Sequence, residues 1–276
     1  MSTPRHIRLR DAPHLPRELV EQLETDTTLP NGADERFVGY GVMGVSFESG
    51  HVLALRRWVT SSIGPAYTSV WYRSPDGVWR FHADVDPTLA CTRYAGAVAD
   101  EALVHRVRLR WTSPQTLVVE VPAAALRWSM RMRSTPVTQL FDIVRPLLGE
   151  RLLSSTPALR VLGAMARWGL SAGPVRLMGR MPNGQQFRIV PHHLWVVDDT
   201  WGELDGQPFG APSVPQLQPR LGDFLIPRRP LFAIATAHFD AFDPARHRSV
   251  TSRADAPDEA ISASNGEGTF PSFVPN

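Results

Sequence analysis

The side chains best suited to acid–base chemistry form a short alternating series, His82, Asp84 and Asp86. If this segment is a β-strand, its period of two places all three side chains on one face. A carboxylate in an apolar cavity has a raised pKa and can protonate an alkene, an enol or a leaving group. We therefore predict that Asp84 is a general acid, with Tyr94 or His82 as the partner base.

A simpler interpretation of the same series stays open. On a solvated sheet face these residues would only increase solubility, so the burial of that face decides between the two interpretations. Arg93 precedes Tyr94 in the sequence and could orient a carboxylate of the ligand or hold Asp84 in its ionised form.

Aromatic side chains crowd the segment that leads to this series. They could fill a core or line a cavity for a hydrophobic ligand, as the interiors of β-barrels often do. The predicted ligand-binding residues are Trp58, Tyr67, Trp71, Tyr72, Phe81 and Arg93.

The strand that carries the series is predicted to pair with the preceding strand in a hairpin. Residues 74–77 (Ser-Pro-Asp-Gly) separate the alternating segments 67–73 and 78–85. Pro75 fixes φ near −65°, which excludes a type I′ turn and favours a type I turn with Gly77 as the bulge residue. In this register Trp71 faces Phe81.

Alternation of apolar and polar residues continues through much of the chain. It predicts a strand over 104–111 that pairs with 117–121, and a further strand over 126–133. A later hairpin follows at 175–190, and a last strand at 231–239. Residues 135–170 have helical periodicity instead, and Pro146 should kink or split the first helix.

These elements predict a mainly β protein, either one large antiparallel lipocalin-like barrel or two barrel halves with a helical-pair insertion. The expected organisation is an N-terminal arm (1–36), a first antiparallel β unit (37–134), a helical insertion (135–173), a second β unit (174–243) and a disordered tail (244–276).

The chain has 276 residues and 29 basic side chains, all of which are arginine. Without lysine there can be no Schiff-base lysine, no phosphate-loop lysine and no kinase-type ATP lysine. The net charge is only +2, and the arginines are interleaved with acidic residues, so we predict no nucleic-acid binding. Arginine rows near 104–110 and 127–133 favour a solvated face, with an interaction surface for an acidic partner as the alternative.

The single cysteine, Cys91, excludes an intrachain disulfide and a multi-cysteine zinc site. It fits a reducing cytoplasm. The N-terminus lacks the apolar core of a signal peptide, and no apolar run is long enough to span a membrane. We predict a cytoplasmic protein with no membrane span, metal or cofactor, whose partner is an apolar small molecule.

Two short motif matches lie in the wrong structural context. Residues 39–44 match GxGxxG, but a strand and a turn follow where a dinucleotide site needs a helix. Residues 169–173 match GxSxG, but a helix, a loop and a strand occur where a nucleophile elbow needs a strand, a turn and a helix. Neither match predicts a site.

The residues 44–47 (Gly-Val-Ser-Phe), the segment 67–71, the region of Asp84 and the pair Arg93-Tyr94 look like segments of actinobacterial proteins. The layout of 37–242, with its helical insert and its late Pro-Asn-Gly-Gln-Gln-Phe hairpin, is similar to the lipocalin-like superfamily of carotenoid 1,2-hydratases and their AttH-like relatives. The resemblance implies two lipocalin-like barrel halves and a pocket for isoprenoid or polyketide-like molecules.

The same resemblance implies cofactor-free hydration, cyclisation or isomerisation. No residue role is carried over from it, so the role of Asp84 depends on the strand pattern alone. The β fold of acetoacetate decarboxylase is a structural alternative, but its Schiff-base chemistry needs the lysine that this chain lacks.

The functional prediction is a cofactor-independent lyase or isomerase that acts by acid–base chemistry on a hydrophobic small molecule such as a terpenoid. The alternative is a non-enzymatic lipocalin-like carrier or sensor of an apolar ligand. A carrier needs only an apolar cavity, whereas the predicted catalyst also needs a carboxylate inside it.

Overall fold

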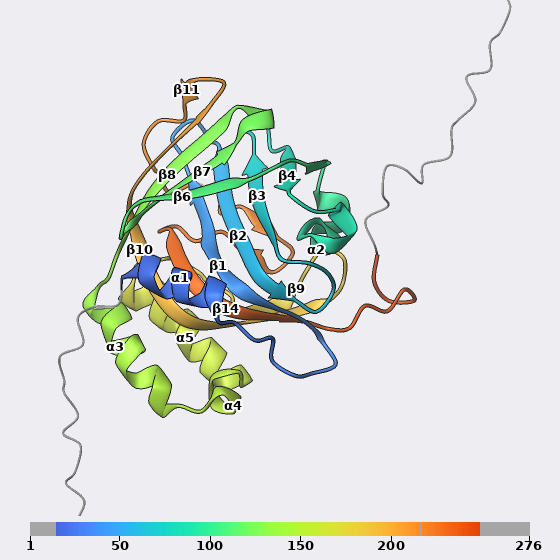
Figure 1. Cartoon of the computed structure of the whole chain (residues 1–276), viewed down its shortest axis with the longest axis vertical. Coiled ribbons are helices and arrows are strands. Elements are labelled where there is room, and N and C mark those ends of the chain that lie inside the picture. The colour runs from blue at the N-terminus through green and yellow to red at the C-terminus, as the bar shows by residue number, and fades with distance from the viewer. Residues whose placement is uncertain (1–14, 216, 249–276) are drawn as a thin grey trace, which may run out of the picture.

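The computed structural model describes residues 15–215 and 217–248, and one large curled β-sheet dominates it (Figure 1). Ten strands follow one another in the order β5-β4-β3-β2-β1-β14-β10-β8-β7-β6, and β9 and β11 pair with β10. The strands of this sheet are β1 (Glu35–Ser46), β2 (Val52–Ser61), β3 (Tyr67–Arg73), β4 (Trp79–Ala83), β5 (Glu101–Val104), β6 (Arg108–Ser113), β7 (Thr116–Val121), β8 (Leu126–Arg133), β9 (Met178–Arg180), β10 (Gln186–Leu204), β11 (Gln207–Pro208) and β14 (Leu231–Phe239).

The first and the last strand of this sheet, β1 and β14, are neighbours at its centre. The two predicted β units therefore contribute to a single sheet. All neighbouring strands in it are antiparallel except the pair β4–β5. The mainly β fold class is confirmed, in the form of a curled, open half-barrel.

The sheet curls so far that a short chain segment joins its two edge strands. β5 and β6 stand at opposite ends of the strand order, yet only residues 105–107 join them. Four Cα–Cα steps span at most about 15 Å, so the two edges approach each other there. The predicted single strand over 104–111 is therefore wrong, because Val104 ends β5 and Arg108 begins β6. Alternation of apolar and polar residues continues through the link and gives no sign of the break.

One face of the curled sheet closes on itself. Strands β1 to β3 pack there against β7, β8 and β10, and we call the side chains between them the closed core. Helix α1 (Pro16–Thr25) adds Val20 to it. Its large members include Tyr40, Leu53, Leu55, Tyr72, Trp128, Met130, Trp195 and Phe232.

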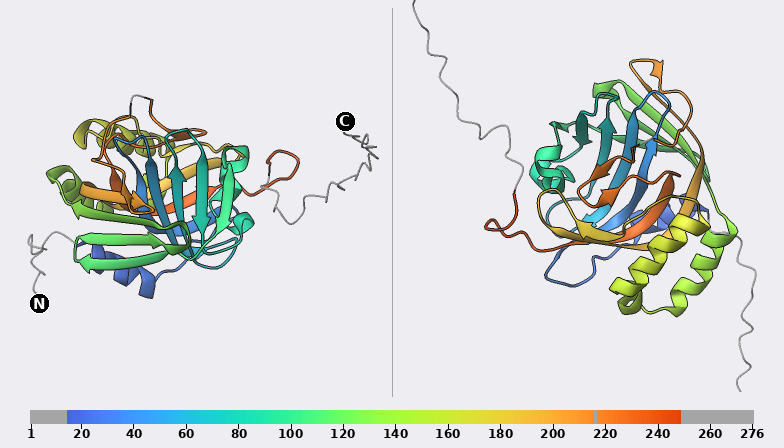
Figure 2. Two further views of the ribbon diagram at one scale, coloured as in Figure 1. Left: turned by 90° about the horizontal axis from the view of Figure 1, so that it is seen from above. Right: turned by 180° about the vertical axis from the view of Figure 1, so that it is seen from behind.

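The opposite face of the central strands is overlaid by shorter segments, and we call it the covered face. Helix α2 (Thr92–Ala95) and a hairpin of β12 (Arg220–Leu221) and β13 (Phe224–Leu225) lie over it (Figure 2). The side chains between sheet and cover form a second core, which includes Trp71 and Phe224.

Three helices pack together beside the sheet, α3 (Pro136–Val144), α4 (Glu150–Leu153) and α5 (Thr156–Gly169) (Figure 1). Their inward side chains contact β10 in a third apolar cluster. Short 3₁₀ segments occur at Pro87–Leu89, Gly96–Val98, Pro122–Ala124 and Arg145–Leu147. None of the helices in the described ranges is long and apolar enough to cross a membrane.

Several local predictions are confirmed. Trp71 faces Phe81 in the β3–β4 ladder, and Gly77 has a φ of +95° in the turn. Pro146 splits the first helix, because α3 ends before it and a 3₁₀ segment contains it. Residues 39–44 lie inside β1, so the GxGxxG match is not a phosphate-binding loop. Most of the predicted tail, from residue 249 onwards, lies outside the described residues.

Candidate functional site

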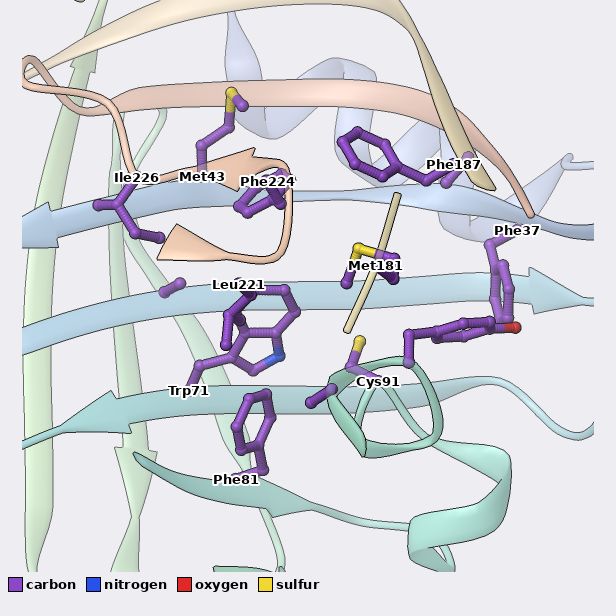
Figure 3. Packing of buried hydrophobic residues seen from close by; sticks show 14 of the residues in the cluster. Phe37, Met43, Trp71, Phe81, Cys91, Met181, Phe187, Leu221, Phe224 and Ile226 are labelled. Atoms are coloured by element: carbon purple, nitrogen blue, oxygen red, sulfur yellow. The ribbon is translucent and has the colours of Figure 1, made fainter. Parts of the chain in front are cut away.

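An apolar cavity lies between the covered face and the segments above it. Figure 3 shows several residues that line it, among them Met43, Trp71 and Phe224. Its volume is about 70 Å³. One water occupies about 10–15 Å³ on this scale, so the cavity has room for a ligand of roughly five to seven non-hydrogen atoms. The apolar lining includes Phe37, Met43, Trp58, Trp71, Met181, Phe187, Ile189, Phe224 and Phe239.

The floor of the cavity consists of small residues from two adjacent central strands. Gly39 and Gly41 come from β1, and Ala233, Ala235 and Ala237 come from β14. Gly39 stands opposite Ala235, and Gly41 opposite Ala233, in the antiparallel register. The three alanines leave open the space that larger side chains would fill.

Gly41 also permits a close approach between β1 and β2. A Cβ at this position would lie 2.0 Å from the carbonyl oxygen of Leu55. No real contact is that short, so the backbone would have to shift for any other residue. The close approach lies beside an irregular register of the two strands, after Val42.

Arg56 of β2 lines the cavity and is only 8% exposed. Its Nη1 donates to the carbonyl oxygens of Val42 at 2.5 Å and Leu55 at 2.6 Å. The guanidinium carbon lies 4.5 Å from the ring centre of Trp71 and 5.2 Å from that of Phe224. Desolvation lowers the pKa of Arg56 to about 10, so the side chain stays charged at neutral pH.

Two pairs of proton-carrying side chains border the cavity at α2. The Cys91 Sγ lies 3.4 Å from the Tyr67 hydroxyl, and the Tyr94 hydroxyl donates to Glu35 Oε2 at 2.6 Å. Burial, and then the neighbouring Glu35, raises the pKa of Tyr94 far above its usual range. Burial, and then Cys91, does the same for the pKa of Tyr67. Both phenols therefore keep their protons at neutral pH.

Several donors hold the Glu35 carboxylate in place, and the residue is 8% exposed. Arg93 Nη2 donates to Oε1 at 2.7 Å, and Gln185 Nε2 donates to Oε2 at 3.1 Å. Asn183 Nδ2 in turn donates to Gln185 Oε1 at 2.6 Å. Neither Glu35 nor Gln185 was predicted from the sequence, because no local pattern shows that the start of β1 and the turn before β10 meet.

The structure places several predicted site residues at the cavity. Trp58, Trp71 and Tyr94 line it, and Tyr67 contacts the lining residue Cys91. Figure 3 shows Cys91, the residue directly before α2, beside the strands of the covered face.

Two other predicted residues lie close behind this lining. Phe81 packs on Trp71 with their ring centres 5.3 Å apart. Arg93 belongs to the site through Glu35, and its guanidinium also lies 4.6 Å from the ring centre of Phe242.

The remaining predicted residues do not line the cavity. Asp84 is exposed, and its Oδ1 accepts from the Thr68 backbone N–H at 2.7 Å. His82 is buried, with its Nδ1 3.0 Å from the Nδ1 of His105. Tyr72 belongs to the closed core. The structure therefore does not bring Asp84 or His82 together with Tyr94.

The arginine row on β8 faces solvent, as expected for its outward positions. Arg127 pairs with Glu120, and Arg131 and Arg133 both pair with Asp198. Partly neutralised in this way, the row is a weak candidate for binding an acidic partner. No group of three His, Cys, Asp or Glu side chains in the described ranges could hold a metal ion.

No family model and no curated protein matches the chain, so the resemblance to carotenoid hydratases stays a prediction. Among solved structures, the chain is similar to the crystal structure of acetoacetate decarboxylase from Legionella pneumophila. The match covers 89% of this chain and 100% of that chain, at 10% sequence identity and a TM-score of 0.36. No residue role follows from so distant a likeness.

Proposed function

We propose that the protein binds a small, mostly apolar molecule in the cavity and moves a proton on it without a cofactor, as an isomerase or lyase. The observation that carries the proposal is the presence of two proton-carrying pairs, Cys91–Tyr67 and Tyr94–Glu35, beside an otherwise largely apolar space. The volume favours a ligand smaller than a terpenoid.

Tyr94 and Glu35 support the base half of the reaction. The Tyr94 oxygen accepts a proton from a ligand C–H while its own proton passes to Glu35 Oε2, 2.6 Å away. The phenol ends the step neutral, and the carboxylate becomes a carboxylic acid. The raised pKa of Tyr94 disfavours a free phenolate, so the two transfers are coupled.

Cys91 and Tyr67 support the acid half. The Cys91 thiol gives a proton to a second carbon of the ligand in an isomerisation, or to the departing group in a lyase reaction. Tyr67 donates to the resulting thiolate and stabilises it. The isomerase cycle closes when the proton held by Glu35 returns to the thiolate, so no proton is gained or lost overall.

Hydrogen–deuterium exchange on small carbonyl compounds tests this proposal. The protein is incubated in D₂O with butanone or 2-oxobutanoate, and loss of the C–H signals is followed by NMR. We expect exchange above the buffer rate for at least one compound, and a fall of at least about 100-fold in the Tyr94→Phe variant.

Two matched variants control the exchange experiment. Tyr72→Phe removes a hydroxyl from the closed core, and Asp84→Asn changes the exposed carboxylate, so both should exchange at the wild-type rate. The proposal is wrong if the wild-type protein does not accelerate exchange, or if Tyr94→Phe accelerates it equally.

A carrier of the same small molecule is the second candidate function. It is favoured because no Asp, Glu or His side chain in the described ranges lines the cavity directly. Native mass spectrometry of protein purified from its source, before and after organic extraction, discriminates the two. A retained compound whose C–H groups the protein does not exchange would favour the carrier.

A further inference from the structure

Arg56 is a buried charge that has no counter-ion among the described residues. No Asp or Glu in the described part of the chain forms an ion pair with it, and the groups that act on its charge are only Cys91 and Tyr67. Burying a charged side chain without a partner is strongly unfavourable, and buried charges in folded proteins are therefore usually paired. An anion in the cavity would supply the missing partner.

The hydrogen-bond donors of Arg56 are only partly used. A guanidinium has five N–H groups, and the two on Nη1 account for the bonds to Val42 and Leu55. Its Nε and Nη2 donate to no atom of the described residues. These two nitrogens form one edge of the planar group, and that edge matches the two oxygens of a carboxylate.

We infer that the natural ligand of the cavity carries a carboxylate, which the Nε–Nη2 edge of Arg56 binds while the rest of the ligand lies on the apolar floor. This inference rests on the proposed function in one respect, namely that the cavity is the ligand site. It adds the substrate class, a monocarboxylic acid of about five to seven non-hydrogen atoms.

The surroundings of Arg56 favour a carboxylate over a phosphate. One guanidinium edge satisfies two oxygens and one negative charge, whereas a phosphate brings further oxygens and up to two charges. Beside the guanidinium, Phe224 offers no donor, and Trp71 offers one, its buried Nε1–H, which has no partner among the described residues. Arg56 is also the only charged side chain among the described residues that line the cavity.

Calorimetric titration with butanoate and butanamide tests the inference, because the two have the same shape and differ in charge. We expect wild-type protein to bind butanoate at least about 10-fold more tightly than butanamide. In Arg56→Met this preference should disappear. The control Arg110→Met removes an exposed arginine and should keep the full preference.

Two further comparisons keep the test decisive. The preference of wild-type protein for butanoate over butanamide is measured without any variant. It therefore tests the inference even if Arg56→Met does not fold. Raising the salt concentration should weaken butanoate binding only slightly, because a buried pair is screened less than an exposed one. Loss of binding at high salt would instead place butanoate on the exposed arginines and overturn the inference.

The titrations separate failure of this inference from failure of the proposed function. Equal binding of butanoate and butanamide, lost in Ala235→Leu, would overturn the carboxylate inference but leave the cavity as a ligand site. Binding of neither compound to wild-type protein, or binding that Ala235→Leu leaves unchanged, would overturn both.

Discussion

The two faces of the central strand β14 differ in the size of their side chains. On β14, Phe232 and Ile234 point into the closed core, whereas Ala233 and Ala235 line the cavity. Because successive residues of a strand point to opposite faces, one strand can be tightly packed on one side and leave space on the other. The closed core can thus stabilise the fold, while the cavity on the covered face leaves room for a ligand.

Two adjacent arginines of β2 also lie on opposite faces, and they differ in burial and in ion pairing. Arg57 is partly exposed and pairs with Glu24 at 2.9 Å. Arg56, one residue earlier, is buried on the cavity side, and no carboxylate in the described part of the chain pairs with it. The paired arginine stabilises the surface only weakly. The buried Arg56 is suited to bind an anionic group of a ligand.

The largest expected effect comes from hollowing the closed core. Trp128 is completely buried, and its Nε1 donates to Thr200 Oγ1 at 2.8 Å. Trp128→Ala should lower the free energy of unfolding by about 4 kcal/mol, since it leaves a cavity and removes the hydrogen bond to Thr200, whose hydroxyl still donates to the Ser129 carbonyl oxygen. Urea denaturation measures the loss.

The control for this variant is Trp201→Ala, on the neighbouring strand. Trp201 is 41% exposed and contacts Arg127, so its loss should cost about 1 kcal/mol or less. Equal losses in the two variants would show that the closed core does not carry the stability assigned to it.

The second largest effect should be a loss of folding stability at acidic pH, caused by the buried His82. Burial, and then His105, lowers the pKa of His82 to about 4. Between pH 6.5 and 4 the unfolded chain binds a proton at this residue that the folded protein does not. Stability therefore falls as the pH falls through this window, by about 3 kcal/mol.

The variant His82→Gln does not titrate, so it should lose correspondingly less stability over the same pH range. Urea denaturation at pH 6.5, 5 and 4 measures both slopes. If both proteins show the same pH dependence, the burial of His82 does not control it.

The smallest effect on stability should come from filling the cavity. Ala235→Leu places a larger side chain on the floor, and because space is available there, the free energy of unfolding should change by about 1 kcal/mol or less. Ligand binding should nevertheless be lost. Thermal unfolding with and without butanoate measures both effects, and a variant that still gains stability from butanoate would break the contrast between the faces.

Much of the fold could be predicted from the sequence, because local alternation determines strands wherever one side faces solvent. The strand over 126–133 is an example, with Trp128 and Met130 inward and Arg127 and Arg131 outward. The break at 105–107 could not be predicted in this way, since it depends on the closure of the whole sheet.

The site was harder to predict, because it is assembled from residues that meet only through topology. Gly41 and Ala235 share a cavity floor because β1 and β14 are neighbours, which no local pattern shows. Similarly, alternation places Arg56 and Arg57 on opposite faces but does not say which face is covered. The strand that was predicted to carry Asp84 and Asp86 ends at Ala83, so only His82 of that series lies in β4, and Asp84 is exposed and does not line the cavity.

Crystals pressurised with xenon would test most directly whether the two faces differ. Xenon enters apolar cavities but cannot enter a well-packed core. We predict a xenon atom above Gly41 and Ala235 in the wild-type protein, and none around Trp128. Xenon in the closed core, or its absence from the covered face, would contradict the division of the sheet into a packed side and a ligand-binding side.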